Sequence, residues 1–245
     1  MQRELTFIKD KLPAISGVAK HVWKKVRFEY RAGIWLEDIH FGLSWFVEGE
    51  SEREKTFVAP SWSWASIRTP IDGKNQGTKA YHAGQYHRGD HSLKDDQLPM
   101  ELELIDCELT PRGKDLFGQI THAGLVLRGL LLELSKWKAR SPIHIGTSFP
   151  QGTESTSYSI CCNFDEPSTT HHYGEDTLVH SGAHILNDLY LLHIYGSDRH
   201  PYESCFLILR PTTTEGEFHR VGLARAETDE LEAAGEWNIR EVTIV

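Results

Sequence analysis

Two indole side chains lie two residues apart in the stretch Phe57-Val58-Ala59-Pro60-Ser61-Trp62-Ser63-Trp64-Ala65-Ser66-Ile67. In an extended chain, side chains two positions apart point to the same side, so the sequence predicts Trp62 and Trp64 on one face and the serines on the other. Each indole buries about 150–250 Å². The stretch therefore predicts either the anchor of a hydrophobic core or the floor of a ligand pocket, and a core is the commoner place for buried Trp.

The composition is that of a folded globular protein. Of the 245 residues, 39% are hydrophobic and 25% are charged, which excludes a disordered or fibrous chain. No composition shift marks a domain boundary, so we expect a single domain over residues 1–245, with a helical part at 1–50 and a mainly β part at 51–245. The thiols Cys107, Cys161, Cys162 and Cys205 form no C-x-x-C pair and are expected to be reduced and mostly buried.

The charge pattern limits the classes of partner. The formal net charge is −9 and no dense basic stripe occurs, so we expect no nucleic-acid binding. No apolar run approaches the ~20 residues that a membrane span needs, and the sequence begins without a signal peptide. We therefore expect a cytoplasmic protein without a membrane span.

Helical patterns are confined to the beginning of the chain. Apolar residues recur every three or four positions over 13–26, with lysines mainly between them, which predicts an amphipathic helix. Residues 33–47 are apolar in nearly every helical direction, which predicts a second helix in the interior. The polar segment 71–98 is expected to be a long loop.

Strand patterns follow after Pro99. The alternation changes phase near Leu104, which predicts a β-bulge there. Further strands are expected over 125–134, 156–164 (half-exposed), 189–195, 205–209, 217–225 and 236–245, with a short helix at 228–234. The predicted class is α+β, predominantly antiparallel β, as a sandwich or barrel-like structure with helices from the first ~50 residues packed at one end.

Several segments together look like one family signature. They are Tyr30-Arg31-Ala32-Gly33-Ile34-Trp35 with Asp38, then Leu43-Ser44-Trp45, then Ala59-Pro60-Ser61-Trp62-Ser63-Trp64-Ala65-Ser66. This pattern resembles the signature that follows the catalytic core of fungal heterokaryon-incompatibility (HET) domain proteins. Residues 10–19 are similar to the segment before the signature, and 115–120, 206–209 and 218–223 resemble later, looser patterns. The resemblance covers most of the chain, and P-S-W-S-W-A-S is its specific core.

The resemblance implies a scaffold more than an activity. HET proteins typically carry, before this region, a TIR-like nucleotide-processing domain that acts in self/non-self recognition. No residue here maps onto the active site of that domain, so NAD hydrolysis is not carried over. The chain is expected to be either a fragment or a stand-alone relative. Trp45, Trp62, Trp64 and Arg220 are expected as core or pocket residues of the shared scaffold. Any function of this chain's own is then expected around them, in residues 71–98 or on the inner faces of the later strands.

Motifs of common catalytic classes are absent from the sequence: there is no G-x-S-x-G, H-E-x-x-H, Walker A or G-x-G-x-x-G pattern. The spacings of His82, His87 and His91, and of His180, His184 and His193, do not predict a metal site. His193 and Tyr195 alternate on an apolar strand and are expected to share an interior face, whereas His219 and Arg220 are expected on opposite faces. His193, Tyr195 and His219 are the candidate acids or bases.

Two functions remain open from the sequence. One is a β-rich binding or regulatory module of HET type, whose double-Trp stretch is structural. The other is a cofactor-free cyclase or isomerase for an apolar intermediate in fungal specialised metabolism, with one tuned acid or base in a dry cavity. In both cases the expected partner is a small apolar molecule or a protein, with no cofactor and no metal. The oligomeric state is left open.

Overall fold

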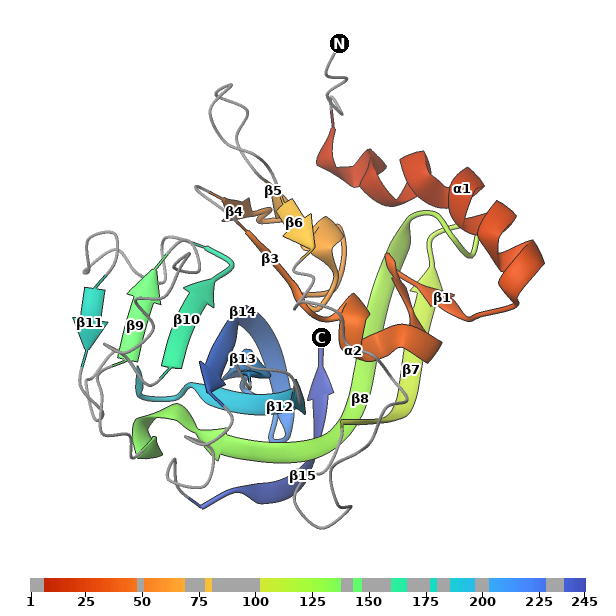
Figure 1. Cartoon of the computed structure of the whole chain (residues 1–245). Helices are drawn as coiled ribbons and strands as arrows, with labels where there is room; N and C mark the ends of the chain where they lie inside the picture. Colours follow the sequence, from red (N-terminus) through yellow and green to blue (C-terminus); the bar gives the residue numbers. More distant parts are fainter. Residues whose placement is uncertain are drawn as a thin grey trace.

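The computed structural model describes residues 7–47, 51–68, 78–80, 102–137, 143–146, 160–166, 177–179, 186–196, 203–227 and 236–245. These residues form a nine-stranded mixed sheet, three two-stranded sheets and a helical part near the N-terminus (Figure 1). The predicted α+β class with predominant β structure is confirmed.

The helices are short except for one. They are η1 (Ile8–Asp10), α1 (Lys11–Val26), η2 (Leu36–Asp38), α2 (Ile39–Gly42), η3 (Trp64–Ser66) and η4 (Leu134–Lys136). The strands are β1 (Tyr30–Arg31), β2 (Ile34–Trp35), β3 (Trp45–Val47), β4 (Glu52–Arg53), β5 (Ile67–Arg68), β6 (Thr78–Ala80), β7 (Glu103–Pro111), β8 (Ile120–Glu133), β9 (Ile143–Gly146), β10 (Ile160–Phe164), β11 (Thr177–Val179), β12 (Tyr190–Gly196), β13 (Glu203–Pro211), β14 (Glu217–Glu227) and β15 (Asn238–Ile244).

Part of the large sheet closes into a ring. Its strand order is β11-β9-β10-β14-β13-β12-β8-β15, and β7 is added along β8. β14 also pairs with β15, through Glu217 with Thr243 and Phe218 with Ile244. The strands β14, β13, β12, β8 and β15 therefore form a closed barrel, in which each strand pairs with a neighbour on both sides. Of the two expected arrangements, the barrel is the one observed.

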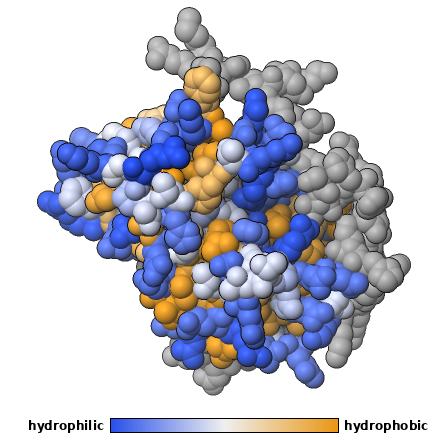
Figure 2. Space-filling model, turned by 180° about the vertical axis from the view of Figure 1, so that it is seen from behind, coloured by the Kyte–Doolittle hydropathy of each residue, from blue (hydrophilic) through white to orange (hydrophobic). Residues whose placement is uncertain are grey.

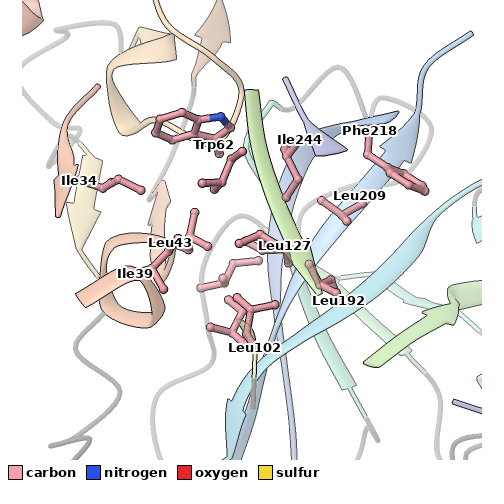
Figure 3. Close-up of a cluster of buried hydrophobic side chains, with 14 of the residues drawn as sticks. Ile34, Ile39, Leu43, Trp62, Leu102, Leu127, Leu192, Leu209, Phe218 and Ile244 are labelled. Carbon is pink, nitrogen blue, oxygen red and sulfur yellow. The ribbon is translucent and has the colours of Figure 1, made fainter. Parts of the chain in front are cut away.

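A cap from the N-terminal third packs against this barrel. Figure 3 shows Ile34, Ile39 and Leu43 on one side of a buried cluster that continues into strand residues. Trp62 lies at the same boundary and is fully buried. The strand residues labelled in the cluster are Leu127, Leu192, Leu209, Phe218 and Ile244. The cap and the barrel thus share one hydrophobic core.

The predicted helix at 33–47 is wrong. Residues 30–35 form a β-hairpin, in which Arg31 pairs with Ile34 and the loop residues Ala32 and Gly33 have φ of 44° and 102°. Positive φ at both loop positions is the geometry of a type I′ turn. Only residues 36–42 are helical, as η2 and α2, and Trp45–Val47 is strand β3. An all-round apolar pattern fits such short buried pieces as well as it fits one buried helix.

The first helix forms close to where it was predicted, but its buried face is narrower. Leu12 and Ala19 are buried, whereas Val18 is 67% exposed and Val26 is 43% exposed. Exposed apolar side chains of this kind lie among hydrophilic ones on the face seen from behind (Figure 2). The described helices are too short or too polar for a membrane crossing.

One detail predicted for the strands is confirmed, and two other predictions differ from the structure. The bulge predicted near Leu104 is found where the β7–β8 register shifts between Leu104 and Asp106. β10 is buried on both faces instead of half-exposed, because Cys161 and Cys162 pack into different hydrophobic clusters. Within the predicted loop 71–98, Thr78–Ala80 forms β6 and pairs with β3. The remainder of that loop and the predicted helix 228–234 lie outside the described residues.

Candidate functional site

The double-Trp stretch is not extended. A turn is closed by the backbone N–H of Ser63, which donates to the Pro60 carbonyl at 3.0 Å, and the 3-10 helix η3 begins at Trp64. The Ser63 hydroxyl oxygen accepts from the Ala65 N–H at 3.1 Å and thereby caps η3. The predicted sharing of one face by the two indoles is therefore wrong. Trp62 is fully buried in the core, and Trp64 is only partly buried.

Trp64 is held against the β1–β2 hairpin. Its indole N–H donates to the Gly33 carbonyl at 3.0 Å. A Cβ placed on Gly33 would lie 2.6 Å from the Trp64 Nε1 atom, and the φ of 102° is one that other residues rarely adopt. Glycine at position 33 therefore permits both the hairpin turn and the close approach of the indole.

The β1–β2 hairpin, η2, α2, β3 and η3 line an open hollow of about 350 Å³. Trp45 and Ile34 are buried residues of its wall, whereas Trp35, Phe41 and Trp64 are partly exposed. We call this site the aromatic hollow, and its lining residues are Gly33, Ile34, Trp35, Asp38, Phe41, Gly42, Trp45 and Trp64.

Asp38 is the only titratable residue among the described residues that line the aromatic hollow. It is exposed and lies at the junction of η2 and α2. The site therefore combines apolar aromatic walls with one carboxylate at a solvent-exposed position.

Cations contact two of the aromatic walls. The guanidinium carbon of Arg220 lies 3.4 Å from the Trp45 ring centroid, and the Nζ of Lys11 lies 5.8 Å from the Trp64 ring centroid. Neither cation is among the residues that line the hollow. The negative face of an aromatic ring attracts a cation, and a protein cation already lies near each of these two rings. The rings therefore attract a second cation in the hollow less strongly.

Lys11 is partly buried and lies close to Trp64 and β5. Its ammonium donates to the Ile67 carbonyl. Burial lowers the pKa of Lys11 from its ordinary value to about 8.

Arg220 is fully buried and joins the barrel to the cap. Its Nε donates to Asp165 Oδ2 at 3.1 Å, and its Nη1 donates to the Leu43 carbonyl at 2.7 Å. Its Nη2 donates to the Trp45 carbonyl and to Asp165 Oδ1, the latter at 3.3 Å. Its backbone N–H donates to the Ser61 hydroxyl at 2.9 Å. Burial lowers the pKa of Arg220, and the Asp165 carboxylate opposes that shift. Arg220 thus fixes the segment that carries the Trp45 wall.

A second arginine extends this network. Arg53 donates from Nε to Glu166 at 3.0 Å, from Nη1 to the Ser66 hydroxyl at 2.9 Å, and from Nη2 to the Arg220 carbonyl at 3.2 Å. Its Nη2 also lies 3.7 Å from Asp165 Oδ2. Two arginines therefore face two carboxylates, with Arg220 and Asp165 as the buried pair and Arg53 and Glu166 as a partly exposed pair beside it.

The candidate acids and bases lie outside the aromatic hollow. His193 and Tyr195 are both buried, but a β-bulge between them places them on different faces of β12. His193 packs 5.4 Å from the ring of Phe206 in one hydrophobic cluster, whereas Tyr195 belongs to the other. The predicted shared face is therefore wrong.

The neighbouring residues His219 and Arg220 lie on opposite faces of β14, as predicted. His219 is exposed and its Nδ1 lies 3.3 Å from the Val245 carbonyl, while Arg220 is fully buried. His219 is therefore separated from the hollow, and Arg220 supports the hollow without lining it.

Within the described part of the chain, no group of three or more His, Cys, Asp or Glu residues is placed to hold a metal ion. His82, His87, His91, His180 and His184 lie outside the described residues. None of the described cysteines forms a disulfide.

The sequence pattern does not single out Phe41 or Asp165: Phe41 falls within the predicted buried helix, and no pattern pairs Asp165 with Arg220. Trp35 belongs to the family-like signature, but the predicted helix does not place it at a surface hollow. The usable signal was Gly33 between Tyr30-Arg31 and Ile34-Trp35, because a glycine between two short strand-forming segments is compatible with a two-residue hairpin turn.

Comparisons with known proteins identify no relative of this chain. No family pattern matches the chain, and no match was found among curated proteins or solved structures.

Proposed function

We propose that this chain is a binding module of HET type, whose aromatic hollow receives a neutral aromatic or other flat apolar group of a small molecule or protein partner. The observation that carries the proposal is the hollow itself. Its volume of about 350 Å³ lies at the lower end of the range of ligand pockets, which is about 300–1,000 Å³.

The residues of the family-like signature support this proposal by their convergence. Residues 30–35, 43–45 and 59–66 are separate in the sequence, yet each contributes to the wall of the one hollow. Arg220, which lies in a later part of the resemblance, backs the Trp45 ring. A signature that builds a cavity wall suits a binding function better than a signature that only fills a core.

The charge distribution favours a neutral ligand. Trp45 and Trp64 already contact protein cations, which lowers the attraction of their rings for a cationic group. A neutral ring, in contrast, gains stacking or edge-to-face contacts with the indoles. Asp38 adds a hydrogen-bond acceptor for a hydroxyl or N–H on the ligand. The preferred ligand is therefore an aromatic group that carries a donor.

Binding is favoured over the cyclase or isomerase alternative. An enzyme of that kind needs an acid or base with a shifted pKa in a dry site. Among the described residues that line the hollow, Asp38 is the only candidate, and it is exposed to solvent. The buried candidates His193 and Tyr195 lie elsewhere. The geometry thus supplies a surface for recognition, with one carboxylate to orient the ligand.

The test uses 2-naphthol, naphthalene and tetramethylammonium as probes of the purified full chain, with binding measured by saturation-transfer NMR. We expect 2-naphthol to bind, naphthalene to bind several-fold more weakly, and tetramethylammonium to compete poorly. Phe41→Ala should weaken 2-naphthol binding about tenfold, since loss of one aromatic contact costs about 1.4 kcal/mol. Phe28→Ala is the matched control, because Phe28 is 42% exposed and lies outside the hollow. Equal binding by the Phe41→Ala variant and the wild type would refute the proposal.

Asp38→Asn separates recognition from chemistry at the same site. Under our proposal this variant weakens 2-naphthol binding a few-fold and leaves naphthalene binding unchanged, because only 2-naphthol offers a hydrogen-bond donor. If the Asp38→Asn variant binds both probes as tightly as the wild type does, the carboxylate does not orient the ligand.

A further inference from the structure

A row of chemically reactive side chains crosses the sheet at β9, β10, β14, β13 and β12, which lie next to one another in Figure 1. His144 pairs with Cys161, and Cys161 pairs with Arg225 on its other side. Arg225 pairs with Cys205, which pairs with Tyr195. Directly paired residues on neighbouring strands point to the same side of a sheet, so these five side chains share one face.

Within this row, a thiol and an imidazole are in contact. The Nδ1 atom of His144 lies 3.1 Å from the Sγ atom of Cys161, and the two residues are 6% and 2% exposed. A thiol within hydrogen-bond reach of an imidazole nitrogen is the arrangement that activates cysteine nucleophiles. The Cys161 S–H donates to Nδ1 when the ring hydrogen is on Nε2.

Arg225 is the cross-strand partner of Cys161 on β14, so its side chain leaves the sheet on the same face as the thiol. Arg225 is partly buried. Burial lowers the pKa of Arg225 to about 10, so the guanidinium stays charged near neutral pH. A neighbouring cation favours a thiolate over a thiol. Cys161 is therefore in contact with a base from β9 and paired across β14 with a residue that carries a cation.

We propose that Cys161 is a nucleophilic cysteine, with His144 as its base, and that it takes small soft electrophiles such as activated alkenes. This site is independent of the aromatic hollow, since neither residue lines it. In the reaction, the thiol proton moves to His144 Nδ1 and a bond forms between Sγ and the β-carbon of the alkene. The π electron pair moves to the α-carbon, which then takes the proton from the imidazolium. No other reactant is required.

The chain contains its own matched control. Cys162 follows Cys161 directly and is 0% exposed, but it faces the other hydrophobic cluster. Burial raises the pKa of the Cys162 thiol to about 12. The two thiols are 2% and 0% exposed, so solvent exposure alone favours neither of them. Cys107 is a second reference; it is half-buried, and burial raises its pKa to about 11.

The experiment treats the folded full chain with acrylamide at pH 7 and follows each cysteine by peptide mass spectrometry, with fragment ions to separate Cys161 from Cys162. We expect Cys161 to be modified at least tenfold faster than Cys162 and Cys107. Equal rates at Cys161 and Cys162 would overturn the proposal, because the imidazole would then be only a core hydrogen-bond partner.

The variant His144→Phe tests the base while keeping an aromatic ring in the core. We expect the rate at Cys161 to fall at least tenfold and the rate at Cys107 to stay the same. An unchanged rate at Cys161 contradicts the assignment of His144. If the variant unfolds, Cys162 becomes reactive in the same spectrum, and the ratio between Cys161 and Cys162 in the wild type then decides the question alone.

Discussion

Replacing Arg220 by Met should be among the most damaging single changes in this protein. Methionine keeps much of the length of the side chain but removes the hydrogen bonds to Asp165, Leu43 and Trp45. The Asp165 carboxylate, which is 1% exposed, is then left without its main partner. Breaking a buried ion pair in this way costs about 3–5 kcal/mol. Arg53 at 3.7 Å from Asp165 offsets part of that cost.

We therefore expect Arg220→Met to lower the free energy of unfolding by about 4 kcal/mol, out of a total of about 5–15 kcal/mol for a typical protein. Urea unfolding followed by far-ultraviolet circular dichroism measures this change. With a slope of about 3 kcal/mol/M, the midpoint falls by about 1.3 M. The control Arg240→Met removes an exposed arginine from the barrel strand β15 and should change stability by less than about 0.5 kcal/mol.

A double variant tests the reason for the loss. Asp165→Asn alone leaves the Arg220 charge buried and should cost about 3 kcal/mol. The variant with both changes has neither buried charge. Its loss of unfolding free energy should therefore be about 2 kcal/mol smaller than the sum of the two single losses. Additive losses, or an Arg220→Met loss below about 1 kcal/mol, would refute the view that the pair holds the cap on the barrel through charge and hydrogen bonding.

Three other substitutions follow from the structure. Gly33→Ala places a Cβ 2.6 Å from Trp64 Nε1 at a φ of 102° and should cost about 2 kcal/mol in thermal unfolding; an unchanged melting temperature contradicts this. Gly17→Ala, with nothing within 4 Å of the added carbon in α1, should stabilise by about 0.5–1 kcal/mol in urea unfolding, and any loss counts against it. Lys11 has a folded pKa of about 8, below its ordinary 10.5, so the unfolded chain binds more protons between these values and stability rises with pH there. Relative to Lys11→Met, the wild type should gain stability from pH 8 to 10, and a constant difference between the two refutes the shift.

The sequence was a good guide where one strand face differs from the other. The change of phase near Leu104 predicted the bulge in β7 because alternation reports directly on which side a residue faces. The placement of His219 and Arg220 on opposite faces of β14 was predicted from the two-residue period of a strand, which does not say which of the two is buried. Near Leu104, in contrast, the order of polar and apolar residues records which side chains face the core.

Alternation fails where both faces are buried. In β12, Leu191, Leu192 and Ile194 are all buried, so the bulge between His193 and Tyr195 has no counterpart in the hydrophobic pattern. The same ambiguity turned residues 33–47 into one predicted helix, although tertiary packing divides them into a hairpin, a helical turn and a strand.

The aromatic hollow was beyond sequence reasoning for a related reason. Its walls come from the β1–β2 hairpin, η2, α2, β3 and η3, and the approach of these elements depends on contacts that span long stretches of chain. One of these is the pair Arg220 and Leu43, which are 177 residues apart in sequence. No local pattern encodes such a pair.

The closed barrel also has a consequence for how the chain folds. The strands that complete the ring, β14 and β15, follow the cap residue Trp62 by more than 150 residues. Trp62 packs into the core shared with these strands, so during synthesis its indole has no complete apolar site until they have emerged from the ribosome. Such non-local closure is intrinsically slow and leaves hydrophobic surface open to aggregation. We therefore expect the newly made cap to be the segment that most needs protection by a chaperone.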